Sequence, residues 1–277
     1  MTRLMRPGII LVLGGNGRLG RALRHQWREA RNVLWQARAP GADLVWSPGQ
    51  PWPGPAQVSA IVALWGVVPG AGDLTENAAL ALAAQDLGAA LGADRVLHCS
   101  SAAVYVPDPA PRPEDAANPS NPYGTAKLAM EQALHEWCTD HADGPAACAL
   151  RIGNVAGADS VFASIARGGP VTMDRFADGH GPRRSYLDHA TLGRVVQALL
   201  ACPRADLPEV VNVANAGVID MADLVRAADR RLIWRDAGHQ GHTVALDLSR
   251  LRRIVDPGPT DPATLLADAA LFAGSAA

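Results

Sequence analysis

The sequence lacks several features that mark particular classes of protein. Its 25 basic and 27 acidic residues nearly cancel, giving a net charge of −2 over 277 residues, so no basic surface for nucleic acid or an anionic membrane is expected. No apolar run approaches the roughly 20 residues that span a bilayer, and the N-terminal apolar run breaks into glycines too early for an export signal. These absences predict a cytoplasmic protein that binds neither nucleic acid nor membrane.

Cysteine is scarce as well. The four cysteines are scattered, without the close pairs of a metal site, and they lie in ordinary helix or strand patterns. We therefore expect no metal ion and a reducing environment. The four are Cys99, Cys138, Cys148 and Cys202.

What the sequence does have is an alternation of short apolar runs with long alanine- and leucine-rich stretches of helical spacing. Such alternation predicts parallel strands joined by crossover helices, hence an α/β protein with a doubly wound, Rossmann-type parallel sheet. Strands are expected at Ile9–Leu13, Asn32–Gln36, Leu44–Trp46, Ala60–Trp65, Arg95–Ser100, Ala147–Ile152 and Val210–Val213, and helices at Arg18–Ala30, Glu76–Leu91, Tyr123–Asp140 and Asp188–Ala201.

The stretch "IILVLGGNGRLGRAL" places three glycines between a strand and a helix. Gly14 permits a tight turn, Gly17 lets the backbone approach a pyrophosphate, and Gly20 lets the helix pack on the sheet. The helix N-terminus adds free N–H groups and the positive end of a dipole. The motif predicts a dinucleotide site, against the alternative of a plain strand–helix turn. The expected cofactor-binding residues of this turn also include Asn16, Arg18 and Leu19.

The G-x-x-G-x-x-G spacing resembles the extended branch of the short-chain dehydrogenase/reductase superfamily, the NAD(P)-dependent epimerases, dehydratases and reductases. An acid at the end of the second strand would bind the adenosine ribose, but "NVLWQARAPGAD" offers Gln36 and Arg38 there. This favours NADP over NAD as the cofactor, the alternative being that Arg38 is a solvated surface residue. Asp43, further along, is expected to begin the third strand.

In "NPYGTAKLAMEQAL", Tyr123 and Lys127 stand one helical turn apart and share a face. The ammonium, together with the positive ring of an oxidised nicotinamide, is expected to lower the tyrosine pKa from about 10 toward the working range. Tyr123 could then exchange a proton with the substrate while hydride moves. The alternative is an ordinary helix start with a surface lysine, but the stretch closely resembles the superfamily's catalytic signature.

The stretch "HCSSAAVYVPD" runs an apolar strand into two serines. The resemblance implies that Ser101, four residues before Tyr105, helps the catalytic tyrosine polarise the substrate oxygen. Ser100 is expected to pack or cap beside the cofactor, with the reverse assignment of the two serines left open. Val106 replaces an expected glycine, which allows the following loop a different path.

Two further positions follow from the resemblance. The fourth strand ends in "ALWGVVPG", so Trp65 and Gly66 are expected to form an altered cofactor wall, with core packing as an equal alternative for the tryptophan. Asn77 in "LTENAALALAAQ" falls where relatives carry an asparagine that supports the lysine, and a helix-start cap explains it nearly as well.

After Gly157 the pattern loosens into segments rich in glycine, proline and charge. We expect residues 1–156 and 186–214 to form the dinucleotide-binding domain, and 157–185 and 215–277 a small, discontinuous substrate-binding lobe. In the tail, elements are expected at Met221–Arg231 (helix), Thr243–Leu246 (strand) and from Pro262 onward (helix).

Later motifs are looser but in the right order. "LRIGNVAG", "RRSYLDHA" and "VVNVANAG" resemble superfamily segments that lead into and out of the substrate lobe. Because nucleotide sugars are common ligands there, Arg183 or Arg184 could pair with a substrate phosphate, a solvated loop arginine being the equal alternative. Asp188 is expected to cap a helix and His189 to be structural.

Sugar dehydratases of this superfamily carry Thr-Asp-Glu where this chain has Ser-Ala-Ala, so dehydration is not expected. The expected function is an NAD(P)-dependent oxidoreductase or epimerase that moves hydride to or from a sugar or nucleotide sugar. The alternatives are an NADPH-dependent reductase of a small carbonyl compound and a dinucleotide sensor without turnover. If the chain dimerises as relatives do, the helices at 76–91 and 123–140 would pair with their copies.

Overall fold

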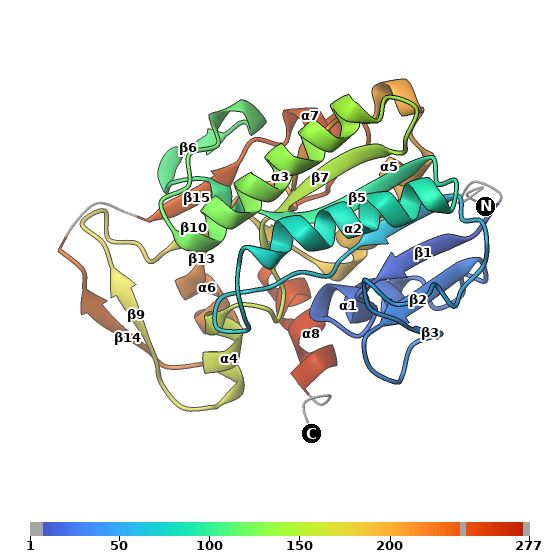
Figure 1. Ribbon diagram of the computed structural model, residues 1–277. Helices are drawn as coiled ribbons and strands as arrows, with labels where there is room; N and C mark the ends of the chain where they lie inside the picture. Colours follow the sequence, from blue (N-terminus) through green and yellow to red (C-terminus); the bar gives the residue numbers. More distant parts are fainter. Residues whose placement is uncertain (1–7, 239–241, 274–277) are drawn as a thin grey trace. The chain divides into compact units, whose positions relative to one another are not determined.

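The computed structural model describes residues 8–238 and 242–273, and the chain divides into two compact units (Figure 1). The first unit comprises Met1–Val104, Pro119–Arg151 and Gly193–Val211. The second comprises Tyr105–Asn118, Ile152–Leu192 and Asn212–Ala277. Residues 105–118 therefore group with the second unit, although the sequence placed them in the dinucleotide-binding domain.

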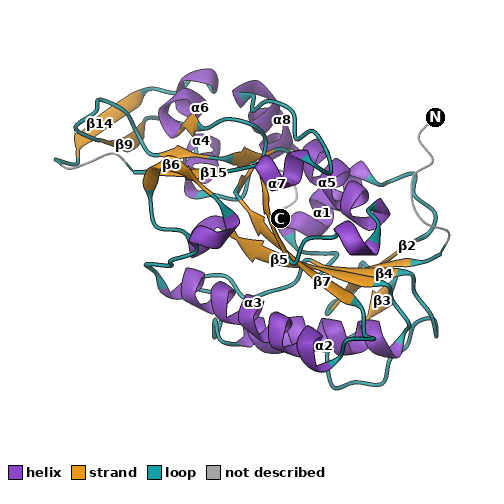
Figure 2. Cartoon of the chain, turned by 90° about the horizontal axis from the view of Figure 1, so that it is seen from above, coloured by secondary structure: helices purple, strands orange, loops and turns teal. Residues whose placement is uncertain are grey.

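The first unit is built on a seven-stranded sheet of order β12-β7-β5-β4-β1-β2-β3. The pairings of β1 with β2 and β4, of β2 with β3, and of β4 with β5 are parallel. Figure 2 shows α2 and α3 against one face and α1 and α5 against the other, which is the predicted doubly wound architecture. Every residue of β1 and β4 is buried, as burial on both faces requires. The strands are β1 (Ile10–Leu13), β2 (Val33–Ala37), β3 (Leu44–Val45), β4 (Ala60–Ala63), β5 (Arg95–Ser101), β7 (Ala146–Ile152) and β12 (Val210–Val213), and the helices are α1 (Arg18–Gln26), α2 (Glu76–Ala90), α3 (Pro122–Asp140) and α5 (His189–Ala201).

The second unit combines short strands with small helices around its own apolar core, in which Phe162, Tyr186 and Leu224 are among the buried side chains. Its strands form a four-stranded sheet of order β13-β10-β15-β6 and the pairs β11-β8 and β14-β9. The strands are β6 (Asp108–Arg112), β8 (Asn154–Val155), β9 (Val171–Arg175), β10 (Arg183–Arg184), β11 (Tyr186–Leu187), β13 (Ile219–Asp220), β14 (Leu232–Asp236) and β15 (Thr243–Leu246), and the helices are α4 (Ser160–Ala166), α6 (Met221–Ala227), α7 (Ser249–Arg252) and α8 (Pro262–Ala273).

The predicted long elements are present, and most short ones were missed. Two-residue strands carry no period to detect, and β9 and β14 lie in the segment where the pattern loosens. The first helix ends at Gln26 rather than Ala30, with Trp27 as its C-cap. Within the described ranges, no helix is both long and apolar enough to traverse a bilayer.

Candidate functional site

The glycine turn has the geometry that the motif requires. Gly14 has a φ of +85°, and a Cβ there would lie 2.8 Å from the backbone nitrogen of Trp65. A Cβ on Gly20 would lie 2.3 Å from the Gly14 oxygen, so the helix can sit this close to the turn only with glycine. Gly17, the N-cap of α1, has only the Gly14 oxygen near its Cβ position. Open space therefore adjoins the helix N-terminus, as a pyrophosphate would need.

The other predicted residues of the turn lie on its outer side. Asn16 is exposed, and its Nδ2 donates to the backbone oxygens of Ala39 and Pro40, at 3.4 and 3.1 Å. Arg18 and Leu19 form the first turn of α1. Asn16 thus ties the glycine turn to the loop that follows β2.

Gln36, where an acid would bind ribose, is entirely buried and bonded within the protein. Its Oε1 accepts from the Gly14 nitrogen at 3.1 Å, and its Nε2 donates to the Trp46 oxygen at 2.5 Å. The side chain therefore joins the glycine turn to the end of β3. Arg38, two residues on, is exposed. The missing acid was recognised from the sequence, but the two internal hydrogen bonds of Gln36 were not predicted. The signal for them was an amide side chain at the end of an apolar strand, where burial is expected.

Three tryptophans stand beside this turn. The rings of Trp46 and Trp65 are stacked, with centroids 6.1 Å apart and planes 23° apart, and Trp52 meets Trp46 edge-on at 5.2 Å. Trp65 also packs against the buried cluster that contains Leu13. The structure thus shows packing for Trp65, and its stacking on a ligand stays a prediction.

The local sequence around Asn121 seats the first turn of α3 beside the end of β5. The Asn121 side chain caps the helix by accepting from the Gly124 nitrogen at 2.9 Å, and Pro122 begins the helix. A Cβ on Gly124 would lie 2.0 Å from the Ala103 oxygen, so glycine permits the close approach. Ala103 belongs to a 3₁₀ turn, Ala102–Val104, that directly follows β5.

The structure places Tyr123, Lys127 and Ser101 near one another; they are three of the four residues predicted to be catalytic, the fourth being Asn77. The Ser101 side chain lies close enough to Tyr123 to lower the tyrosine pKa, and its hydroxyl accepts from the Ala103 nitrogen at 3.1 Å. The Nζ of Lys127 lies 5.8 Å from the Tyr123 ring centroid and donates to the Cys99 oxygen at 2.9 Å. Lys127 is only 2% exposed, and it is the single lysine of the sequence. A chain that otherwise uses only arginine keeps an ammonium at this one position, a compositional signal that sequence reasoning overlooked.

Burial dominates the protonation of this cluster. Burial raises the pKa of Tyr123 well above its usual value, Cys99 adds to the rise, and the hydrogen bond with Ser101 acts against it. Burial also lowers the pKa of Lys127, which Cys99 and Glu131 partly oppose. The expected fall of the Tyr123 pKa is therefore absent from the chain alone, because desolvation of the phenolate prevails. The Tyr123 side chain is therefore protonated near pH 7.

Asn77 supports the backbone next to Lys127. It is 1% exposed; its Oδ1 accepts from the Val67 nitrogen at 3.1 Å, and its Nδ2 donates to the Val67 and Leu74 oxygens, both at 2.9 Å. A Cβ on Gly66 would lie 2.9 Å from the Asn77 Oδ1 and 3.2 Å from the Lys127 Nζ. Asn77 therefore fixes the segment after β4 against the lysine, rather than capping α2, which starts at Glu76.

The two serines point to different partners. Ser100 is 2% exposed and donates to the Glu131 Oε1 at 2.5 Å. Glu131 is also bound by Arg151, whose Nε lies 3.1 and 3.2 Å from its two oxygens and whose terminal nitrogen lies 2.7 Å from Oε2. Sequence reasoning missed Glu131 and Arg151, although an acid one helical turn after Lys127 was a usable signal. Contact of Ser100 with a cofactor stays a prediction.

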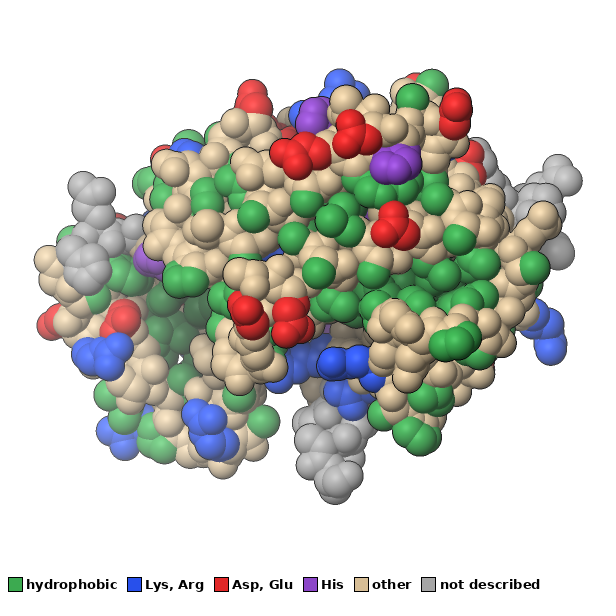
Figure 3. Space-filling view, viewed as in Figure 1, with side chains coloured by type: hydrophobic (Ala, Val, Ile, Leu, Met, Phe, Trp, Pro, Cys, Tyr) green, Lys and Arg blue, Asp and Glu red, His purple; other side chains and the backbone are tan. Residues whose placement is uncertain are grey.

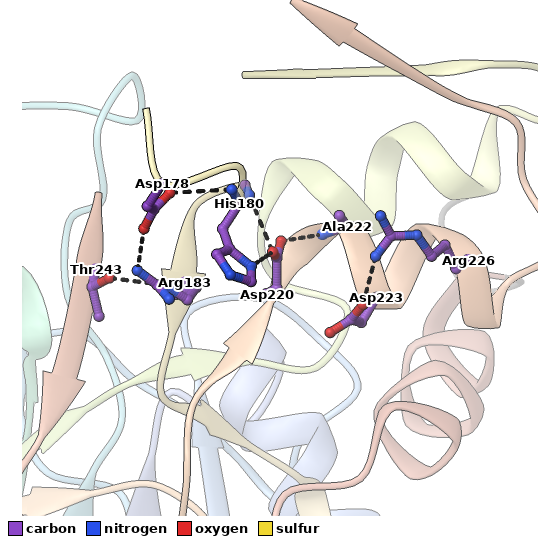
Figure 4. A network of polar contacts seen from close by, with 9 residues as sticks. Asp178, His180, Arg183, Asp220, Ala222, Asp223, Arg226 and Thr243 are labelled. Atoms are coloured by element: carbon purple, nitrogen blue, oxygen red, sulfur yellow. Dashed lines mark hydrogen bonds and ion pairs between the residues drawn. The ribbon is translucent and has the colours of Figure 1, made fainter. Parts of the chain in front are cut away.

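In the second unit, the arginines proposed for a substrate phosphate are held by their own chain, as Figure 4 shows for Arg183. Arg183 donates to Asp178 at 2.5 Å and to the Thr243 hydroxyl at 3.2 Å. Arg184 donates to the His242 oxygen at 2.6 Å, and burial lowers its pKa. Nearby, His180 lies 3.2 Å from the Asp220 carboxylate, which caps α6.

Asp188 and His189 have structural contacts. Asp188 Oδ1 accepts from the Thr191 nitrogen at 2.5 Å, which is a helix cap, and its second oxygen accepts from Asn215 at 2.6 Å. The His189 Nε2 lies 3.2 Å from the Ala156 oxygen. Tyr105 is buried and donates to Asn212 at 2.7 Å, so it anchors the segment that follows the serines within the second unit.

Comparison with known proteins finds a family model that matches more than half of the chain. The model of the NAD dependent epimerase/dehydratase family matches residues 65–214. A UDP-glucose 4-epimerase of Azospirillum brasilense is 48% identical over 77 residues, which make up 26% of this chain and only 22% of that protein.

Two solved structures share the fold. A short-chain dehydrogenase/reductase superfamily protein of Agrobacterium tumefaciens with bound NAD has a TM-score of 0.76 at 20% identity, covering 96% of this chain and 97% of that one. The UDP-N-acetylglucosamine 4-epimerase of Bacillus cereus has a TM-score of 0.74 at 17% identity, covering 95% of both chains.

Proposed function

The chain belongs to the NAD-dependent epimerase/dehydratase family, and we propose that it moves hydride to or from a hydroxyl or carbonyl carbon of a nucleotide sugar. The observation that carries the proposal is the convergence of Tyr123, Lys127 and Ser101 at the carboxyl end of β5. These are the groups that proton transfer beside a hydride carrier needs, and they come from two adjoining elements, β5 and α3.

The residues of the glycine turn fit the cofactor. Gly14, Gly17 and Gly20 leave room at the N-terminus of α1, where backbone N–H groups would hold the pyrophosphate. A cofactor held there would supply the hydride acceptor or donor through its nicotinamide ring. The wall formed by Trp65 and Gly66 follows β4, next to β1 in the sheet.

The roles of the chain's own side chains follow from their protonation. Ser101 hydrogen bonds the substrate oxygen together with Tyr123. The Tyr123 phenol gives its proton to that oxygen in reduction and takes it back in oxidation. Because burial raises its pKa, the protonated form dominates near neutral pH, and added positive charge favours the phenolate. The Lys127 ammonium holds its position through the Cys99 oxygen.

Two observations favour epimerisation of a UDP sugar. The curated relative and the Bacillus cereus structure are both named as UDP-sugar 4-epimerases. The stretch after Ser101 also lacks the two acids with which dehydratases eliminate water. Net reduction with exchanged cofactor remains the second candidate, favoured by the missing ribose acid.

The end of β2 favours NADP among the two cofactors of the superfamily. Gln36 is neutral and cannot repel a 2′-phosphate, and Arg38 stands exposed two residues later. An arginine there can neutralise the added phosphate. All four cysteines are free, which suits a reducing cytoplasm.

The paired helices α2 and α3 support a homodimer. Ala79 of α2 and Ala129 of α3 are exposed, and such small side chains allow close helix packing between copies. In Figure 3, hydrophobic side chains gather among acidic ones on the face that these helices form in the same view of Figure 1.

The proposal is tested by mixing the protein with UDP sugars and either cofactor and following epimer ratios and cofactor absorbance. Tyr123→Phe is expected to lower kcat by about a thousandfold while cofactor affinity is kept. Tyr105→Phe, which removes a buried hydroxyl of the second unit, is the matched control and keeps most of its activity. Turnover of simple ketones but not of UDP sugars would favour the small-carbonyl reductase, and tight cofactor binding without any turnover would favour the sensor.

A further inference from the structure

Consecutive residues of β5 bind successive turns of α3. The Cys99 oxygen accepts from the Lys127 ammonium at 2.9 Å, and the Ser101 side chain lies close enough to Tyr123 to lower its pKa. Between these two contacts, the Ser100 hydroxyl donates to Glu131 at 2.5 Å. We call these contacts the β5–α3 seam, whose residues are Cys99, Ser100, Ser101, Tyr123, Lys127 and Glu131.

The spacing of the three α3 residues links the contacts of the β5–α3 seam to one another. Tyr123, Lys127 and Glu131 stand four residues apart and so share one face of the helix. A shift of the strand along the helix would therefore move all three contacts together. Of the three, the bond to Glu131 lies farthest from the tyrosine and is the most deeply buried.

Arg151 fixes Glu131 from a third element. The carboxylate and the guanidinium, on α3 and β7, are 7% and 4% exposed and form a two-pronged contact. A buried carboxylate without such a partner would be strongly destabilising. Because Arg151 carries the charge balance, the Ser100 hydroxyl can be removed without leaving an unpaired ion.

We propose that Ser100 and Glu131 are positioning residues, whose hydrogen bond sets the register of β5 against α3 and so the distance between Ser101 and Tyr123. The inference rests on the proposed function, because it gives this contact a role in turnover. Neither residue need touch the substrate: each acts through the reacting groups beside it.

The first test compares Ser100→Ala with a matched serine elsewhere in the sheet. Ser59 lies just before β4, at the amino end of that strand, and its hydroxyl donates to the Ile9 oxygen at 2.8 Å. Ser100→Ala is expected to lower kcat by about tenfold to a hundredfold with KM little changed, because a misplacement of a fraction of an ångström suffices. Ser59→Ala is expected to keep its kcat. Ser100→Thr, which retains the hydroxyl, is expected to restore most of the rate.

The pH dependence of kcat supplies a second measurement, which a general loss of packing would leave unchanged. The bond from Ser101 lowers the Tyr123 pKa, so weakening it in Ser100→Ala should shift the acid limb of kcat for oxidation to higher pH. An unchanged kcat and limb in Ser100→Ala, or equal changes in Ser59→Ala, would overturn the proposal. A Ser100→Thr protein that melts like the wild type but is as slow as Ser100→Ala would overturn it too.

The second test needs no turnover. With one lysine in the chain, selective ¹⁵N-lysine labelling gives one side-chain ammonium signal. That signal should move in Ser100→Ala and stay in Ser59→Ala if the seam couples Ser100 to the lysine. An unchanged ammonium signal in Ser100→Ala would overturn the positioning role. A wild-type protein without turnover on any UDP sugar sinks the proposed function instead, so the two failures are distinguishable.

Discussion

The carboxyl ends of β5 and β2 lie on the same edge of one parallel sheet, yet they are built in opposite ways. At β5, the groups near the carboxyl end are bound by another element, α3: the Ser100 hydroxyl by Glu131 and the Cys99 oxygen by Lys127. At β2, both polar atoms of the Gln36 side chain bond to the backbone of other residues: Oε1 accepts from the Gly14 nitrogen, and Nε2 donates to the Trp46 oxygen. The end of β5 thus holds the groups that are proposed to react, whereas the proposed choice of cofactor depends on the residues around Gln36.

Among the variants that test this contrast, the largest effect is expected at Lys127, whose ammonium binds the end of β5. Lys127→Arg keeps the charge, but the larger planar guanidinium does not fit a site that is 2% exposed with the Cys99 oxygen at 2.9 Å. We expect kcat to fall by about a hundredfold, measured with the substrate on which the wild type turns over. Arg28→Lys, the reverse exchange at an exposed position, is the control. A fully active Lys127→Arg protein would show that charge alone suffices.

The next largest effect is expected at the end of β2, on the free energy of unfolding. Gln36→Leu leaves the Gly14 N–H and the Trp46 carbonyl without their partner, so the free energy of unfolding is expected to fall by about 3 kcal/mol in urea denaturation. Gln132→Leu, on the exposed side of α3, should change it by less than about 0.5 kcal/mol. Equal losses in the two variants would mean that the two hydrogen bonds of the Gln36 side chain do not stabilise the fold.

The same contrast explains what the sequence could predict. The doubly wound sheet, the superfamily and the three groups of Tyr123, Lys127 and Ser101 follow from apolar periodicity and short motifs, which act locally along the chain. The seam contact between Ser100 and Glu131 joins residues 31 apart, and the Gln36 bonds link three strand ends, so neither has a local pattern. The raised pKa of Tyr123 depends on burial, which spacing alone does not report.

A smaller effect tests how completely the side chains of β5 are shielded from water. His98 is fully buried, with its Nε2 3.0 Å from the Gln85 Oε1, and burial, aided by Lys127, lowers its pKa to about 3. The unfolded chain has a histidine pKa of about 6.5, so between these values it binds more protons than the folded chain, and stability falls as pH falls. From pH 7 to pH 5, the wild type should lose about 2 kcal/mol more than His98→Gln in urea unfolding. Parallel losses would mean that His98 is protonated in the folded state.

The smallest effect tests discrimination at β2. Arg38→Ala is expected to lower the ratio of NADPH to NADH affinity by about tenfold, because an exposed arginine gains only about 1.4 kcal/mol from a phosphate. Quenching of the seven tryptophans gives both affinities without turnover. Arg31→Ala, an exposed arginine before the start of β2, should leave the ratio unchanged. If the wild type binds NADH more tightly, Arg38 is a solvated residue, and the glutamine at the end of β2 serves the fold rather than the choice of cofactor.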